Sequence, residues 1–172
     1  MSSIGYSNSA VDPAHHGTTD TCAEAVLADK FLPSVDTQAY LGRGVYFFDG
    51  NEQIAEKWAQ KAKEKRKSSG WALLRARVTL GTCLDLTSYA HCKLVKEMAR
   101  QLKERNVQNV TEAVAISALV ELDAEVKVDT VRAVQRRARS EQLIPGGHFY
   151  SGNIIIICVV ETDMISNVQL VC

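Results

Sequence analysis

Seven consecutive apolar residues, Ile154 to Val160, constrain the fold more than any other segment of the chain. Four of them are isoleucines, and β-branched residues of this kind favour strands. No polar residue alternates with the apolar ones, which is typical of a strand that is buried on both faces. The segment therefore predicts a central strand in the interior of a sheet.

The remaining segments predict strands near both ends of the chain and helices between them. Apolar residues at helical spacing predict helices from about Thr19 to before Pro33, and over 52–67, 88–105, 111–123 and 129–141. Short apolar runs predict strands over 45–48, 71–80 and 168–171. Residues 7–14 are rich in Ser, Asn, Asp and Pro and predict a loop, so that only 3–6 remain of a first strand. This order predicts one α+β domain over residues 1–172, with a helical insertion before the last strands.

Charge and cysteine content narrow the classes of function. The chain has 20 basic and 20 acidic residues, which argues against a strongly basic nucleic-acid binder but leaves local patches open. Its five cysteines contain no Cys-x-x-Cys pair, so we expect buried free thiols and no metal site. No apolar run reaches transmembrane length and no signal peptide is evident, so we expect a cytoplasmic protein without membrane contact.

Two short motifs carry the candidate chemistry. The first is His16-Gly17-Thr18, and the second is the run Gly-Arg-Gly-Val-Tyr-Phe-Phe-Asp over 42–49. The glycine after His16 would let a ligand approach the backbone, and Tyr46 on a strand could stack its flat ring on another ring. His15 does not suggest a metal site together with His16, because neighbours on a strand point to opposite faces.

Together these motifs resemble the ADP-ribosyltransferase superfamily, the catalytic domains of poly(ADP-ribose)-polymerase-like and diphtheria-toxin-like type. The resemblance implies a split antiparallel β-core and NAD as the substrate. It implies that His16 contacts the adenine-side ribose, with Thr18 hydrogen-bonding nearby. It also implies that the Gly17 backbone holds the nicotinamide amide, that Tyr46 packs on the nicotinamide ring, and that Gly44 belongs to the NAD-binding motif.

Two positions depart from the family pattern. The second aromatic residue that many members stack on the nicotinamide corresponds to Lys57, so Trp58 is the candidate in its place, although its position in an apolar stripe favours a core role. The late-strand position where the family often has a glutamate corresponds best to Ile156, and the nearest acid is Glu161 at the far end of the strand. With His16 and Tyr46, Ile156 completes the candidate catalytic set. Members with an apolar residue there transfer one ADP-ribose and do not elongate chains.

The resemblance therefore implies an enzyme that transfers a single ADP-ribose from NAD to a nucleic acid or a protein. By analogy with small bacterial members, it acts as a toxin with an antitoxin partner or as a phage-defence effector. The spacing of Arg132, Arg136 and Arg139 on the predicted helix 129–141 indicates a face for RNA or DNA, or a solvated face. Two alternatives remain: an inactive module that binds NAD or ADP-ribose, and a scaffold protein whose motifs are accidental.

Overall fold

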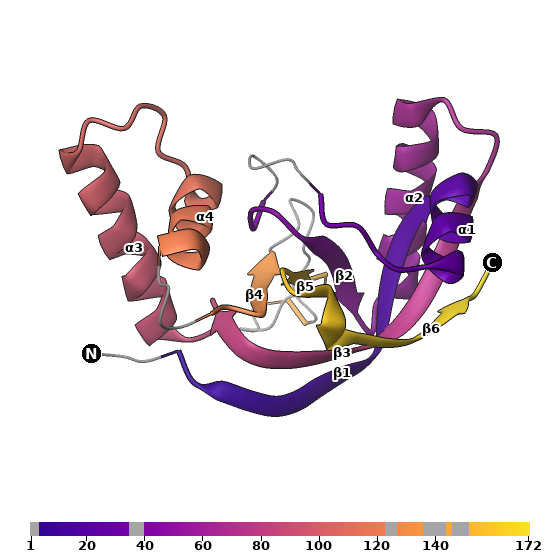
Figure 1. The fold of residues 1–172 in the computed structure, drawn as a ribbon, viewed down its shortest axis with the longest axis horizontal. Coiled ribbons are helices and arrows are strands. Elements are labelled where there is room, and N and C mark those ends of the chain that lie inside the picture. Colours follow the sequence, from indigo (N-terminus) through magenta and orange to yellow (C-terminus); the bar gives the residue numbers. More distant parts are fainter. Residues whose placement is uncertain (1–3, 35–39, 123–126, 136–143, 146–151) are drawn as a thin grey trace.

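The computed structural model describes residues 4–34, 40–122, 127–135, 144–145 and 152–172 (Figure 1). Within them lie six strands: β1 (Tyr6–Thr19), β2 (Val45–Asp49), β3 (Trp71–Asp85), β4 (Thr130–Gln135), β5 (Ile154–Val159) and β6 (Ile165–Leu170). They also contain four α-helices, α1 (Asp20–Ala28), α2 (Glu52–Arg66), α3 (Tyr89–Glu104) and α4 (Glu112–Leu122), and a short 3-10 turn, Thr162–Met164. Helices α1 and α2 lie at one end of the sheet and α3 and α4 at the other. No helix in these ranges has the length and apolar character needed to cross a bilayer.

Five of the strands pair with one another to form a closed ring. The sheet has the order β1-β2-β5-β4-β3-β6, and β1 also pairs with β3, so that the first five form a ring and β6 adds to the outside of β3. The β3–β4 pair is parallel and the other pairs are antiparallel. The predicted mixture of helices and strands, with α3 and α4 before the last strands, is confirmed. The described strands do not show the predicted division into a split antiparallel core, because they join in one closed ring.

The predicted central strand is confirmed as β5, which pairs with β2 on one side and β4 on the other. Its side chains alternate between two core clusters on opposite faces of the sheet. Ile157 and Val159 belong to the first cluster, which also holds Phe47 and Leu74. Ile156 and Cys158 belong to the second cluster, which α2, α3 and α4 cover. Both faces of β5 are therefore removed from water, as its unbroken apolar composition requires.

The loop predicted over 7–14 is wrong, because these residues belong to the long strand β1. Polar residues and Pro13 favour turns in isolation, but the strand accommodates them through irregularities in its pairing with β3, between Ser7 and Ala10 and between Val11 and Ala14. A proline is tolerated in a sheet at such a bulge, where its missing N–H breaks no ladder bond. The first strand is therefore complete, contrary to the prediction that only 3–6 remained.

The helix predicted over 129–141 is wrong for residues 130–135, which form β4. Arginines at helical spacing suggested one helix face, but β4 pairs along its whole length with the isoleucines of β5. Its β-branched Thr130 and Val131 are fully buried, which fits a strand better than an exposed helix. Residues 136–141 of the predicted helix, including Arg136 and Arg139, lie outside the described residues.

Gly17 is where helix α2 comes closest to the sheet. A Cβ atom on Gly17 would lie 1.9 Å from the carbonyl oxygen of Ala55 and 2.8 Å from the amide nitrogen of Ala59. Both contacts are to the helix backbone, which cannot move aside without displacing the whole of α2. A side chain at position 17 is thus incompatible with the observed packing of α2 on β1.

We predict that Gly17→Ala lowers the free energy of unfolding by at least about 2 kcal/mol, the cost typical of overpacking a tight site. Urea unfolding measures it. The matched control is Gly5→Ala, because a Cβ atom on Gly5 would meet no atom within 4 Å. Equal stabilities of the two variants would show that α2 does not pack on β1 as described.

Candidate functional site

The two motifs meet because β1 and β2 are neighbours. Ala14 pairs with Asp49 and His15 with Phe48, which brings His16 beside the middle of β2. The Nδ1 atom of His16 lies 2.7 Å from the carbonyl oxygen of Tyr46. Residues that are thirty positions apart in the sequence are therefore joined by a hydrogen bond. Sequence analysis predicted that the two motifs act together, and the structure places them in contact.

The hydrogen bond fixes the protonation of the His16 imidazole. A carbonyl oxygen only accepts, so Nδ1 must carry the proton and Nε2 is left with a lone pair. Burial between the rings of Phe31 and Phe47, whose centroids lie 5.2 and 5.5 Å from that of His16, lowers the pKa of the imidazole. The bond to Tyr46 raises this pKa by a smaller amount, and the charge of Arg66 lowers it. His16 is thus a neutral side chain whose Nε2 can accept a hydrogen bond from a ligand hydroxyl.

The side chain of Tyr46 lies on the opposite face of the sheet from that of His16, in the second core cluster. Its hydroxyl donates to the carbonyl oxygen of Gly42 at 2.6 Å and accepts from the amide of Leu41 at 3.0 Å. The phenol therefore holds the turn that leads into β2. Beside it, burial raises the pKa of the Cys158 thiol to about 12, and the nearby Tyr46 hydroxyl offsets only part of this effect, so the thiol stays protonated.

The small residues of the motifs serve the packing of the backbone. The face of Gly17 is filled by α2, as described above, and Thr18 is buried in the sheet. A Cβ atom on Gly44 would lie 2.4 Å from Cys158 Sγ and 2.7 Å from the carbonyl oxygen of Val159. Gly42 has φ +85°, a conformation that favours glycine. These contacts explain the glycines without a ligand.

Trp58, the candidate second aromatic residue, belongs to an aromatic group on the Tyr46 face. Its ring centroid lies 5.7 Å from that of Phe48 and 6.0 Å from that of Tyr40, and both Trp58 and Tyr40 are exposed at the surface. The sequence analysis missed Tyr40, because no motif marks it. Ile156 pairs with Phe48 and is only 3% exposed, so it offers a ligand almost no surface.

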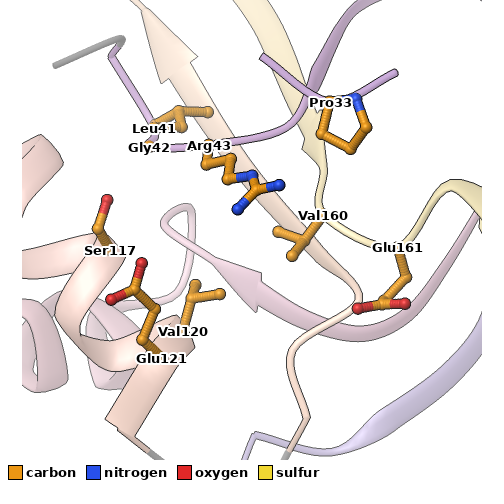
Figure 2. A pocket seen from close by; sticks show the side chains of 9 residues that line it. All are labelled: Pro33, Leu41, Gly42, Arg43, Ser117, Val120, Glu121, Val160 and Glu161. Atoms are coloured by element: carbon orange, nitrogen blue, oxygen red, sulfur yellow. The ribbon is translucent and has the colours of Figure 1, made fainter. Parts of the chain in front are cut away.

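A cavity of about 310 Å³ lies beside the second motif, between its turn, the end of β5 and α4. Figure 2 shows Arg43 in the middle of this cavity, with Glu121 of α4 on one side and Glu161 on the other. Glu161 also forms an ion pair with Lys127 at 2.8 Å. The cavity adjoins the turn that Tyr46 holds, since Leu41 and Gly42 are part of its wall. Glu161 was the acid expected nearest to the site, whereas nothing in the sequence indicated Glu121.

Arg132 does not belong to a three-arginine helix face, because it lies on β4. Its guanidinium is 3.6 Å from an Asp49 carboxylate oxygen and 3.5 Å from an Asp85 carboxylate oxygen, and its side chain is 25% exposed. Arg132 thus links β4 to the C-terminal ends of β2 and β3. Within the described residues, Arg132 therefore connects strands and is not presented to a nucleic acid.

A search against models of known protein families finds no match, and none of the curated proteins compared is significantly similar to the chain.

We predict that the His16 imidazole titrates below 6.5 and carries its proton on Nδ1 at neutral pH. An imidazole that stays neutral in the fold but charges in the unfolded chain makes the unfolded state bind more protons, so acidification from pH 6.5 downward lowers stability. The loss is at most about 1.4 kcal/mol per pH unit for each such histidine.

Nitrogen-detected NMR of the imidazole measures both the pKa and the tautomer, and urea unfolding at neutral pH and at about pH 5 measures the loss. The pKa of His15 is also lowered, chiefly by burial, so His16→Phe should reduce the loss without abolishing it. A proton on Nε2, or titration above 6.5, would contradict the hydrogen bond to Tyr46.

Proposed function

We propose that the chain is an NAD-dependent ADP-ribosyltransferase that transfers a single ADP-ribose to a macromolecule. The observation that carries the proposal is the contact between His16 of the first motif and Tyr46 of the second, through a hydrogen bond of 2.7 Å. The family assignment rests on these motif residues and not on the order of the strands, because the closed ring differs from a split core.

The groups around the two motifs that could hold a dinucleotide lie on both faces of the sheet. His16 Nε2 would accept from a ribose hydroxyl on one face, and the exposed rings of Tyr40 and Trp58 offer a stacking surface on the other, so a dinucleotide that contacts both must pass around the end of β2. The Arg43 guanidinium in the adjoining cavity suits the pyrophosphate. Binding at several separated points would orient the reacting ribose.

The reaction breaks the bond between the ribose C1′ atom and nicotinamide, which leaves with the bonding electrons. The ribose passes through an oxocarbenium-like state, which a nearby carboxylate stabilises. An acceptor oxygen or nitrogen then bonds to C1′ and loses its proton. The carboxylates available in the cavity are Glu121 and Glu161, because the strand position where an acid is expected holds the buried Ile156. We infer single transfer from this absence of an acid at position 156.

The acceptor is a macromolecule whose class the motifs leave open. Arg132 is engaged with Asp49 and Asp85, so the proposal gives it no role in holding RNA or DNA. Arg136 and Arg139 lie outside the described residues. The roles of toxin or phage-defence effector, and of an antitoxin as partner, follow from the resemblance alone.

A second candidate function is an inactive module that binds NAD or ADP-ribose. One observation favours it: the buried Ile156 provides no carboxylate. Such a module would bind the dinucleotide through the same residues but leave its glycosidic bond intact.

We predict that His16→Phe lowers the affinity for NAD about fivefold to tenfold, the effect of losing one hydrogen bond of about 1 kcal/mol. Phenylalanine keeps an aromatic ring between Phe31 and Phe47 but removes both ring nitrogens. Calorimetric titration with NAD measures the affinity, with thermal unfolding as a check on the fold. His91→Ala is the control, because His91 on α3 accepts from the amide of Asp85 and belongs to neither motif.

Two measurements separate the transferase from the inactive module. The transferase releases nicotinamide from NAD, and mass spectrometry of its product shows one ADP-ribose per modified site. Tight NAD binding without nicotinamide release in the presence of cell extract would favour the module. If the parent and His16→Phe both fail to bind NAD, or bind it equally, the assignment of the motifs is wrong.

A further inference from the structure

A row of three polar side chains crosses strands β1, β3 and β6. His15 of β1 pairs with Arg75 of β3, and Arg75 pairs with Gln169 of β6. The Nε and Nη2 atoms of Arg75 both donate to Gln169 Oε1, at 2.8 and 2.5 Å. We call His15, Arg75 and Gln169 the polar row. The two hydrogen bonds to Gln169 hold the guanidinium in one orientation, and within the described part of the chain the Nη1 donors have no partner.

The polar row lines a cavity of about 540 Å³ at the start of helix α2. Glu52, the first residue of the helix, lies on its wall together with Pro13, Gly50, Leu170 and Val171. The amides at a helix N-terminus carry partial positive charge, which favours an anion. None of the residues assigned to the proposed NAD site lines this cavity.

His15 is an unpartnered polar group in this wall. The residue is 5% exposed, and its Nδ1 atom is buried without a hydrogen-bond partner among the described residues. Its Nε2 atom is 3.9 Å from a Glu52 carboxylate oxygen, which is too long for a hydrogen bond. Of the two ring nitrogens, Nε2 is the one close to Glu52 in the cavity wall, and a ligand that accepted from Nε2–H would give it the hydrogen bond that Glu52 does not make.

Glu52 is a replaceable neighbour of His15. Its side chain is 59% exposed, and it makes no closer contact with the imidazole than 3.9 Å. Its carboxylate can move into solvent when another anion enters. A tetrahedral oxyanion matches the donors that would then surround it, namely Arg75 Nη1, the imidazole Nε2–H and the first amides of α2.

We propose that this cavity is a binding site for a phosphate group, held by Arg75 and by Nε2–H of His15 at the N-terminus of α2. The cavity is larger than one phosphate, and Pro13, Leu170 and Val171 give it partly apolar walls, so the ligand is a phosphate ester with an apolar or aromatic substituent. Inorganic phosphate shares the recognised group and binds more weakly. The site is independent of the proposed reaction with NAD.

The test is a titration of the intact chain with phenyl phosphate and with inorganic phosphate at constant ionic strength, followed by NMR of the His15 side chain and the Gly50 and Glu52 amides. We expect these signals to shift together, with phenyl phosphate binding more tightly. Arg75→Gln should weaken binding at least about tenfold. Glu52→Gln should strengthen it, because it removes the competing carboxylate.

Arg77→Gln is the matched control. It removes the same charge from the same strand, where Arg77 pairs with Asp12 at 3.4 Å and does not line the cavity. It should bind phenyl phosphate as the parent does. Equal weakening by Arg75→Gln and Arg77→Gln would mean that only net charge matters and would overturn the proposal. An unshifted His15 signal at saturating phenyl phosphate would overturn it as well.

Discussion

Strand β1 pairs with partners on both of its edges, and the rest of the structure depends on this. Ala14 and His15 face β2 on one side and β3 on the other, so that a single strand closes the ring of five. The same register sets His16 against the carbonyl oxygen of Tyr46 and Gly17 under α2. A shift of the register by one residue would exchange the two faces of β1, and both the contact of His16 with Tyr46 and that of Gly17 with α2 would be lost.

Close backbone packing then limits what the site can do. Gly17 and Gly44 are required where α2 meets β1 and where β2 begins against β5, so both glycines have a structural reason to be present. Arg132, between Asp49 and Asp85, links β4 to the C-terminal ends of β2 and β3. Ligand chemistry is left to groups at the margins of this framework: the Nε2 atom of His16, the exposed aromatic rings, and the charged side chains of the cavity beside the second motif.

Much of the framework could be predicted from local patterns. The run 154–160 is short and rich in β-branched residues, which favours a central strand, and the strands and helices flanking the second motif have strong periodicity. β1 was missed because the polar residues around Pro13 are accommodated by bulges that depend on the partner strand β3. β4 was missed because the spacing of arginines was given more weight than the β-branched residues Thr130 and Val131, which its pairing with β5 buries.

The candidate site also has some features that the sequence could predict and others that it could not. The sequence predicted that the two motifs act together, but not the hydrogen bond from His16 to the Tyr46 carbonyl oxygen, because it depends on the pairing of β2 with β1, which was missed. That Gly17 packs against α2 could not be predicted either, since it depends on the approach of a helix thirty-five residues later. Nor could the position of Glu121, which a helix between β3 and β4 brings beside Arg43. Sequence spacing carries no information about contacts made by separate elements of this kind.

The most direct test of the account is to map the NAD contact surface by NMR, using the backbone amides and the indole and imidazole side chains during a titration with NAD. If NAD is the substrate, the shifts will concentrate on His16, on the turn Leu41 to Arg43 and on Trp58. The nicotinamide end of NAD will cause no shift in the signals of the polar row of His15, Arg75 and Gln169. Saturating NAD that leaves His16 and Trp58 unshifted would contradict the account.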